Sequence, residues 1–269
     1  MISCKEYALI QKERLKKKIN RYEGKPKLVV VQVGDDPASN SYIHSKRKSC
    51  EEVGIELEHV HITDYESVSQ QELELRIQTI DECKMVDGII VQLPIPDKYD
   101  VEKIQNCISP VKDVDGFRVD SLHKPCTPKG IIDWLKFNGY DFEDKVATVF
   151  GRSKIVGKPM ANMLIEEGTT TICCNSKTRE LEKYMAMSDL CICAIGKPNF
   201  FCGYFKEGSI VIDVGINRDG AGKLCGDVDR ECLEKHHDNV YVTPVPGGVG
   251  LLTVVTLLKN VVEAYERRM

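Results

Sequence analysis

Short apolar segments alternate with segments of helical periodicity along almost the whole chain, and this alternation restricts the fold more than any other feature. The run KLVVVQV at 27–33 is apolar throughout, which is typical of a strand buried on both faces. Further strands are expected at 55–62, 87–96, 145–150, 169–174, 189–194 and 209–214. Helices are expected at 3–21, 38–54, 69–82, 100–107, 130–139, 157–167, 178–187 and 249–269. Strands separated by helices form parallel sheets, so the sequence predicts an α/β protein.

A loop-rich stretch divides this series in two. Residues 109–130 read SPVKDVDGFRVDSLHKPCTPKG, and their proline, glycine and aspartate content is typical of a junction between domains. A chain of 269 residues is long enough for one large domain or two of medium size. We therefore expect two α/β lobes.

Charge and hydropathy exclude several classes of protein. The formal net charge of −4 argues against nonspecific nucleic-acid binding, which needs a basic surface. No apolar run approaches the ~20 residues that cross a bilayer. The N-terminal segment has the pattern of a basic amphipathic helix without a signal-peptide cleavage site, and Glu6 and Glu13 count against a transit peptide. We expect a cytoplasmic protein with no membrane and no nucleic-acid partner.

Cysteine is abundant, with twelve residues, but its spacing is irregular and contains no C-x-x-C. Several cysteines lie in apolar stretches such as LCICAIG at 190–196. We expect small buried side chains in a reducing compartment. No metal site is expected, because no Cys/His quartet has ligand spacing.

The stretch GRSKIVGKP at 151–159 joins an expected strand to an expected helix, which is the usual cradle for a pyrophosphate. The G-x-G-x-x-G fingerprint is absent, because Arg152 and Ser153 stand where a second glycine is expected. The following strand ends in NSKT at 175–178 and not in the carboxylate that binds the ribose of NAD. Hydroxyls, an amide and Lys177 suit an anion better than a diol, and Arg152 adds a charge-assisted bond. The pattern favours NADP; the alternative is that both cations are ordinary surface residues.

The first half of the chain carries weaker signals. Tyr42 and Lys46 are four residues apart and share a helix face, although helical lysines are usually solvated. Gln92 ends a buried strand, where ligands of open α/β sheets collect. Asp115, in the glycine loop KDVDGF, could accept hydrogen bonds from an NH-rich heterocycle. A Tyr-x-x-x-Lys pair also marks short-chain dehydrogenases, but there the glycine fingerprint comes first, whereas here Tyr42 precedes Gly151 by more than 100 residues.

Taken together, these stretches resemble the bifunctional methylenetetrahydrofolate dehydrogenase/cyclohydrolase family. The resemblance runs in family order from about residue 28 to 256, and GRSKIVGKP and PVPGGVG are its most specific parts. The other matching stretches are VQVGDDPASNSYIHSKRK, DGIIVQLPIP, SPVKDVDGF, PCTPKG, IVIDVGIN and GDVD.

The resemblance implies an NADP-dependent oxidation of 5,10-methylenetetrahydrofolate to 5,10-methenyltetrahydrofolate, followed by hydrolysis to 10-formyltetrahydrofolate. It implies two α/β lobes around a cleft, the C-terminal one a Rossmann-like parallel sheet. The folate-binding catalytic domain would comprise residues 1–118 plus 250–269, and the NADP-binding domain residues 119–249. Tetrahydrofolate derivatives would be the ligands, purine biosynthesis the pathway served, and a homodimer the assembly.

The resemblance also assigns residues. Lys46 would be the principal catalytic residue, hydrogen-bonded to Gln92 and supported by Tyr42, which would flank the folate, while Asp115 would hold the pterin. A lysine acts as a base only when its pKa is depressed, for example by burial and a nearby cation. Leu93, Pro246 and Gly247 would complete the folate site. The NADP contacts would be Gly151, Arg152, Ser153, Ile155, Ser176, Ile216, Gly250 and Thr253.

The chain departs from the family pattern at two places. Asn175 stands where a histidine is usual beside Ser176, and Leu251-Leu252 replaces the usual Pro-Met before Thr253. The alternatives are a monofunctional NAD(P)-dependent methylenetetrahydrofolate dehydrogenase, a noncatalytic folate- or nucleotide-binding relative, and another two-lobed oxidoreductase such as one acting on shikimate-like hydroxy acids. The last carries a different glycine turn and gives no reason for SYIHSK and VQLPIP.

Overall fold

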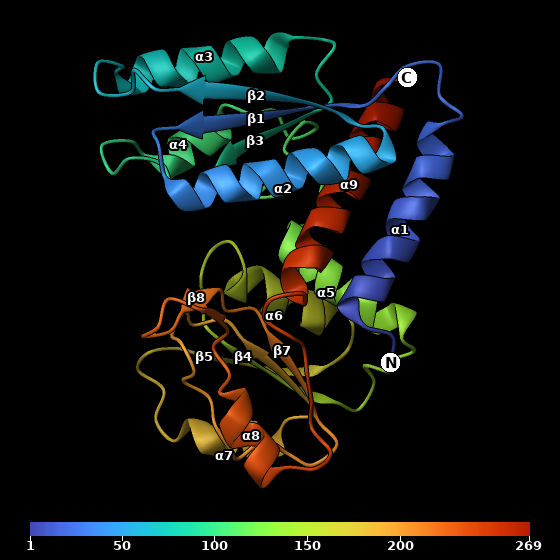
Figure 1. Cartoon of the computed structure of the whole chain (residues 1–269), viewed down its shortest axis with the longest axis vertical. Coiled ribbons are helices and arrows are strands. Elements are labelled where there is room, and N and C mark those ends of the chain that lie inside the picture. The colour runs from blue at the N-terminus through green and yellow to red at the C-terminus, as the bar shows by residue number, and fades with distance from the viewer. The chain divides into compact units, whose positions relative to one another are not determined.

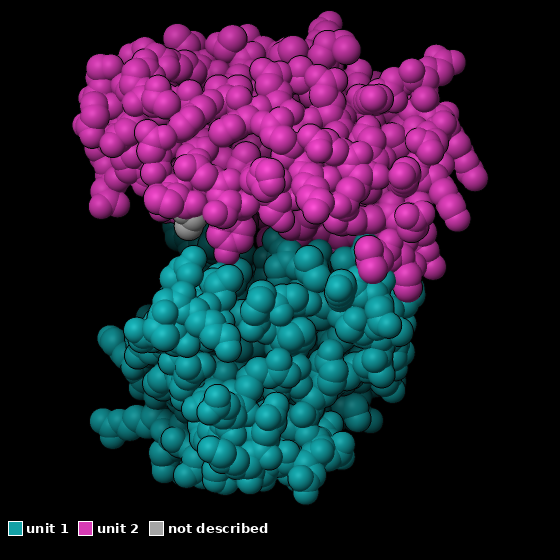
Figure 2. All heavy atoms as spheres, viewed as in Figure 1, with its two compact units in different colours: residues 1–8, 127–253 teal, residues 9–126, 254–269 magenta. Residues whose placement is uncertain are grey.

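The computed structural model describes residues 1–37 and 39–269 in full, and residue 38 as part of a helix. The chain forms two compact units (Figure 2). Unit 1 comprises residues 1–8 and 127–253, and unit 2 comprises residues 9–126 and 254–269. The chain therefore passes between the units after residues 8, 126 and 253, and the predicted domain boundaries lie after residues 118 and 249.

Unit 2 is built on a three-stranded parallel sheet in the order β2-β1-β3 (Figure 1). Its strands are β1 (Lys27–Val33), β2 (Glu56–Ile62) and β3 (Gly88–Gln92). Its helices are α2 (Pro37–Val53), α3 (Gln70–Glu82) and α4 (Val101–Asn106), with most of α1 (Cys4–Ile19) and of α9 (Val249–Arg268).

Local sequence signals set the ends of α2. The Asp36 carboxylate accepts a hydrogen bond from the Ser39 N–H, so that it caps the helix next to Pro37. Gly54 ends the helix in the left-handed region at φ 94°, where glycine carries no Cβ penalty. The apolar side chains of β1 and β3 then pack against α3 and α4, with Leu73, Ile77 and Ile104 fully buried.

Unit 1 is built on a five-stranded parallel sheet in the order β10-β7-β6-β4-β5. The order reverses between β4 and β6, because the chain goes from β4 to β5 on one side and returns to β6 on the other. Its strands are β4 (Val146–Phe150), β5 (Thr170–Cys174), β6 (Leu190–Cys193), β7 (Ile210–Asp213) and β10 (Tyr241–Val242), with the antiparallel pair β8 (Asn217–Arg218) and β9 (Leu224–Cys225) beside them in sequence. Its helices are α5 (Cys126–Phe137), α6 (Gly157–Glu166), α7 (Leu181–Met187) and α8 (Arg230–His236).

Three local predictions are wrong. Helix α5 begins at Cys126, inside the stretch predicted as loop, because Pro128 lies in its first turn, where proline is tolerated. Strand β3 ends at Gln92, before the prolines that remove ladder donors. The short elements α8, β8, β9 and β10 were not predicted, because two to seven residues are too few to establish a period.

The prediction that the cysteines are buried and free is wrong for six of them, including Cys107 and Cys225, which are only half-buried. Cys202 and Cys232 form a disulfide, and Cys83 and Cys173 are exposed. Backbone hydrogen bonds of Phe201 to Asp227 and Asp229 bring the two paired segments together. Spacing alone could not reveal a pair 30 residues apart. Within the described residues, no helix combines enough length with enough apolar character to cross a bilayer.

Candidate active site

The amine of Lys46 and the amide of Gln92 meet at the carboxyl ends of the strands in unit 2. Lys46 lies on α2 one turn after Tyr42, and its Nζ donates a hydrogen bond to Gln92 Oε1 at 2.9 Å. Gln92 is the last residue of β3 and pairs in register with Gln32 of β1. Because the strand order reverses between β1 and β3, this is the topological switch point of the sheet, where ligands of open α/β sheets bind.

A second hydrogen bond fixes the orientation of the Gln92 amide. Its Nε2 donates to the carbonyl oxygen of Leu93 at 2.7 Å. With its NH₂ group committed to a carbonyl, the amide presents its oxygen to Lys46. Both side chains are half-buried. Gln92 therefore positions the amine by accepting a hydrogen bond and adds no charge of its own.

The buried Gln32 ties the start of α2 to the sheet. Its Nε2 donates to Asn40 Oδ1 at 2.8 Å, and its Oε1 lies 2.9 Å from His59 Nε2. Desolvation, reinforced by the neighbouring His61, lowers the pKa of His59, so the neutral ring donates from Nε2 to the glutamine. This network holds the helix that carries Lys46 in place relative to β3. No motif in the sequence indicated this role for Gln32.

The two acids of KDVDGF have different surroundings. The Asp113 carboxylate is buried and accepts hydrogen bonds from the backbone N–H groups of Gly116, at 3.2 Å, and Arg118, at 2.9 Å. Asp115 is half-buried, and desolvation raises its pKa, while the nearby positive charge of Lys46 lowers it. Asp113 thus shapes the loop, and Asp115 shares an electrostatic environment with the lysine.

Two buried residues that the sequence did not indicate bind the carbonyl oxygen of Val114, the residue before Asp115. The Cys126 thiol donates to the Val114 carbonyl oxygen at 3.3 Å and hydrogen-bonds the Asp115 side chain, which opposes the rise in the carboxyl pKa. Asn260 of α9 donates from Nδ2 to the same Val114 carbonyl at 2.8 Å. The stretch PCTPKG pointed to this region without indicating a role for the cysteine.

Tyr42 extends the polar group along α2. Its side chain is 42% exposed, and partial desolvation raises the pKa of its phenol. The phenol therefore remains neutral and able to donate a hydrogen bond at physiological pH.

In unit 1 the glycine turn after β4 is held together by its own backbone. Gly151 has φ 117°, and a Cβ there would collide with the carbonyl of Ala194, which follows β6. A Cβ on Gly157 would lie 2.6 Å from the carbonyl carbon of Gly151. Ser153 Oγ accepts hydrogen bonds from the N–H groups of Val156 and Gly157, both at 3.2 Å, at the start of α6. The glycines that the fold requires are thus Gly151 and Gly157, and the turn lies at the switch point between β4 and β6.

The NSKT segment after β5 is an Asn-stabilised turn. Asn175 Oδ1 accepts from the Lys177 N–H at 3.0 Å, and the Asn175 N–H donates to Thr178 Oγ1 at 2.9 Å. Ser176 and Lys177 are exposed at its tip, and Arg152 is exposed in the glycine turn. The donors at these two turns are cationic groups and a hydroxyl, which suit a phosphate. Gly151 and Gly157 leave a space in the glycine turn that a Cβ would fill. These residues therefore fit NADP.

Asp227, in the GDVD stretch, organises the loop after β6. Its Oδ2 accepts from the N–H groups of Ile195, at 2.7 Å, and Gly196, at 3.1 Å, and its Oδ1 accepts from the Lys197 N–H at 2.9 Å. The neighbouring Asp213 accepts three backbone N–H bonds, but burial, the larger effect, raises its pKa to about 6. The sequence indicated a function for neither acid, because their partners are backbone groups from separate segments.

The remaining predicted residues lie in unit 1. Ile155 and Ile216 are exposed, as are Pro246, Gly247 and Gly250. Thr253 hydrogen-bonds Thr127 through its hydroxyl at 2.8 Å. At the departure from the family pattern, Leu252 is fully buried within α9.

Comparison with known families assigns both parts of the chain. Residues 2–115 match the catalytic domain, and residues 125–269 the NAD(P)-binding domain, of tetrahydrofolate dehydrogenase/cyclohydrolase. The chain belongs to the tetrahydrofolate dehydrogenase/cyclohydrolase family. The predicted family, the α/β fold with a Rossmann-like C-terminal domain, the enzyme class and the NADP cofactor are confirmed.

Relatives cover the whole length of this family member. The bifunctional protein FolD of Vesicomyosocius okutanii is 42% identical over 100% of this chain and 99% of its own. The crystal structure of the bifunctional FolD enzyme from Campylobacter jejuni has a TM-score of 0.93 and 41% identity, covering 99% of this chain and 98% of that one. The Trypanosoma brucei enzyme, solved with NADP and an inhibitor, has a TM-score of 0.90 and 30% identity, covering 99% and 97%.

Proposed function

We propose that this chain oxidises 5,10-methylenetetrahydrofolate with NADP and hydrolyses the resulting 5,10-methenyltetrahydrofolate to 10-formyltetrahydrofolate. The observation that carries the proposal is the Lys46–Gln92 hydrogen bond at the switch point of unit 2, with Asp115 close enough for its pKa to respond to the lysine charge. Domain matches to both halves of the family support the two activities.

Lys46 handles the proton in the hydrolysis. The methenyl carbon is cationic and electrophilic, so water attacks it and must lose a proton as the bond forms. The hydrogen bond from Nζ to Gln92 Oε1 holds the Lys46 amine in place to take part in that proton transfer. Tyr42, one turn away, donates a hydrogen bond or flanks the folate ring, and Leu93 adds an apolar contact next to Gln92.

Asp115 holds the pterin. A carboxylate accepts hydrogen bonds from the amine and ring N–H groups of the heterocycle, which repay the desolvation that raises its pKa. Pro246 and Gly247 complete folate binding. Hydride transfer then depends mainly on positioning, because reaction requires the methylene carbon to be held in a near-attack geometry.

In unit 1 the chain supplies the cofactor site. When bound, NADP provides the oxidised nicotinamide that accepts the hydride. Gly151 and Ser153 offer the turn backbone to the pyrophosphate, and Arg152 and Ser176 bind the 2′-phosphate. Ile155, Ile216, Gly250 and Thr253 contact the rest of the cofactor.

We propose a cytoplasmic homodimer with the folate-binding domain at residues 1–118 plus 250–269 and the NADP-binding domain at 119–249, serving purine biosynthesis. The family resemblance supports this assignment. Size-exclusion chromatography with light scattering tests the dimer: a mass of 30.3 kDa corresponds to the monomer and contradicts it.

Replacing Lys46 with methionine tests the central assignment. We expect Lys46→Met to lower methenyl hydrolysis about 10²- to 10⁴-fold, the usual contribution of a general base. The loss of methenyltetrahydrofolate absorbance measures it. Lys48→Met, at an exposed position of the same helix, is the matched control and should retain wild-type rates. Unchanged hydrolysis in Lys46→Met contradicts the role of Lys46.

The same assay separates the alternatives. Wild-type enzyme is given methylenetetrahydrofolate with NADP and NAD in parallel. Reduced cofactor without hydrolysis above the buffer rate identifies a monofunctional dehydrogenase. No reduced cofactor with either nucleotide identifies a noncatalytic relative.

A further inference from the structure

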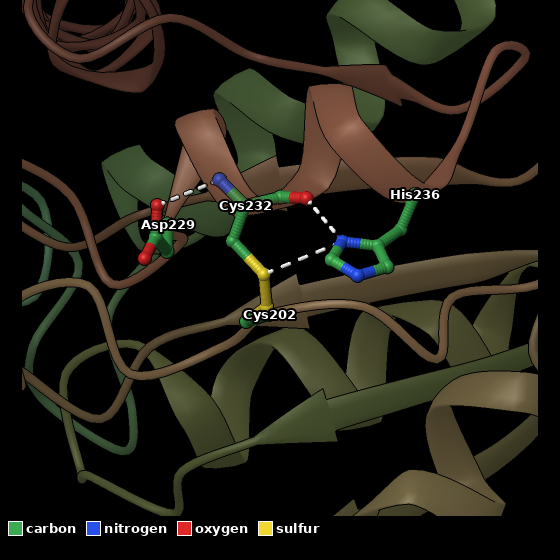
Figure 3. The surroundings of a disulfide bond; sticks show 4 residues. All are labelled: Cys202, Asp229, Cys232 and His236. Atoms are coloured by element: carbon green, nitrogen blue, oxygen red, sulfur yellow. Dashed lines mark hydrogen bonds between the residues drawn. A yellow bond between two sulfur atoms is a disulfide. The ribbon is translucent and has the colours of Figure 1, made fainter.

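Among the residues that the structure describes, Cys202 and Cys232 are joined by a disulfide and the other ten cysteines are free. Figure 3 shows the bond between the segment after Phe201 and helix α8. Their Cα atoms are 5.6 Å apart, a separation usual for a disulfide. Both residues are half-buried, so the bond is open to a small or flexible reactant.

An imidazole accompanies this bond. His236 lies four residues after Cys232, on the same face of α8, and its Nδ1 is 3.7 Å from Cys232 Sγ (Figure 3). The same nitrogen lies 2.7 Å from the Cys232 carbonyl oxygen, so it carries the hydrogen and donates it there. His236 is exposed, which allows it to exchange protons with water. A ring nitrogen beside one sulfur can stabilise that sulfur as a thiolate.

We propose that Cys202, Cys232 and His236 form a thiol–disulfide exchange site whose co-reactant is a dithiol, either a small molecule or a protein. A thiolate of the dithiol attacks Cys202 Sγ, the S–S bond breaks, and its electron pair leaves on Cys232 Sγ. The His236 Nδ1–H, which faces the Cys232 carbonyl oxygen while the S–S bond is intact, turns to donate a hydrogen bond to this thiolate, and the thiolate then takes up a proton. The second thiol of the co-reactant attacks the mixed disulfide and releases Cys202, which is protonated from water. The protein gains two electrons and two protons, and the dithiol becomes a disulfide.

The site lies beside the loop after β6. Phe201, next to Cys202, hydrogen-bonds through its backbone to Asp227 and Asp229. Asp227 in turn holds the N–H groups of Ile195, Gly196 and Lys197. Opening the bond removes the covalent link between this loop and α8, so reduction should increase local opening of both segments.

Thiol counting tests the chemistry. Protein purified in air and unfolded with a thiol reagent should show ten reactive thiols, and protein treated with dithiothreitol should show twelve. The Cys202→Ser variant should show eleven reactive thiols both before and after treatment with dithiothreitol. Cys83→Ser, which removes an exposed free cysteine, should still gain two on reduction. Twelve thiols in the untreated protein, or a stoichiometric zinc ion bound to the three residues, overturns the proposal.

Two further measurements test the histidine and the loop. His236→Gln should slow reduction by dithiothreitol about tenfold, whereas His237→Gln, whose ring pairs with Glu207, should not slow it. Reduction at the wild-type rate in His236→Gln overturns its role. Hydrogen exchange should rise at residues 195–203 and 230–236 on reduction and stay constant at 88–92; equal protection in both states overturns the link to the loop.

Discussion

The two units share one strand arrangement, but one unit builds its site from side chains and the other builds its site from backbone. In unit 2 the order β2-β1-β3 places a switch point at the ends of β1 and β3, and in unit 1 the order β5-β4-β6 does the same at β4 and β6. At the first, side chains converge: Lys46, Gln92 and Asp115. At the second, backbone converges, and Gly151 and Gly157 matter because they have no side chain. A fold can thus supply the location while the residues decide whether the site offers titratable groups or a cradle of peptide groups.

Because the two sites are built separately, Gly157→Ala should change the ratio of dehydrogenase to cyclohydrolase activity more than any other substitution considered. The added methyl group would meet the carbonyl of Gly151 and push the turn open. We expect the dehydrogenase rate to fall about 100-fold, as for a misplacement of about 1 Å. Methenyl hydrolysis, which consumes no NADP, should remain within about twofold. Parallel assays of the two steps measure this.

Gly220→Ala is the control for that experiment. Gly220 lies in the turn between β8 and β9, and nothing lies within 4 Å of the position of its Cβ. Both activities should stay at wild-type values. Equal losses of the two activities in Gly157→Ala would show that the backbone site does not act separately from the side-chain site.

The two acids of one loop provide a sharper comparison inside unit 2. Asp113→Asn removes charge from a carboxylate that accepts two backbone N–H bonds, so the free energy of unfolding should fall by about 1–3 kcal/mol. Asp115→Asn should instead raise the free energy of unfolding at pH 7, because desolvation raises the pKa of Asp115 in the folded state. Urea unfolding measures both.

The stability gained by Asp115→Asn should depend on pH, because the pKa of Asp115 is raised in the folded state. A raised folded-state pKa means that ionised Asp115 costs stability above the ordinary carboxyl pKa of about 3.9, and the cost disappears as the pH falls below that value. The gain from Asp115→Asn should therefore shrink from pH 7 to pH 4, while methylenetetrahydrofolate oxidation is impaired throughout. A loss of stability at pH 7 in Asp115→Asn would contradict the role of desolvation.

The smallest effect is expected at the exposed edge of the proposed cofactor site. Lys177→Gln should lower the preference for NADP over NAD by about 1 kcal/mol or less, which is at most about fivefold, because Lys177 is exposed and screened by solvent. The ratio of kcat/KM values for the two cofactors measures it, at low salt. Lys183→Gln on α7 is the control and should leave the ratio unchanged. An increased preference in Lys177→Gln would contradict a phosphate at this turn.

Within each site, the sequence predicted which residues matter better than it predicted their hydrogen-bond partners. Lys46 and Gln92 were predicted to form a hydrogen bond through the family resemblance, and they form it. Asp115 was singled out in the glycine loop, whereas Asp113 was missed, because only the folded loop shows that the Asp113 carboxylate faces backbone N–H groups. Gln32, Cys126, Asn260 and Asp227 were missed, since each acts through a group distant in sequence.

By itself, the sequence determined the alternating architecture, the position of the glycine turn and the family. These features depend on local periodicity, on the absence of a Cβ and on contiguous motifs, all of which can be read within a few neighbouring residues. Only the tertiary structure decided the strand order, the different burial of Asp113 and Asp115, and the pairing of Cys202 with Cys232. Each of these depends on which distant segments lie side by side, and packing and desolvation take effect only after the chain has brought them together.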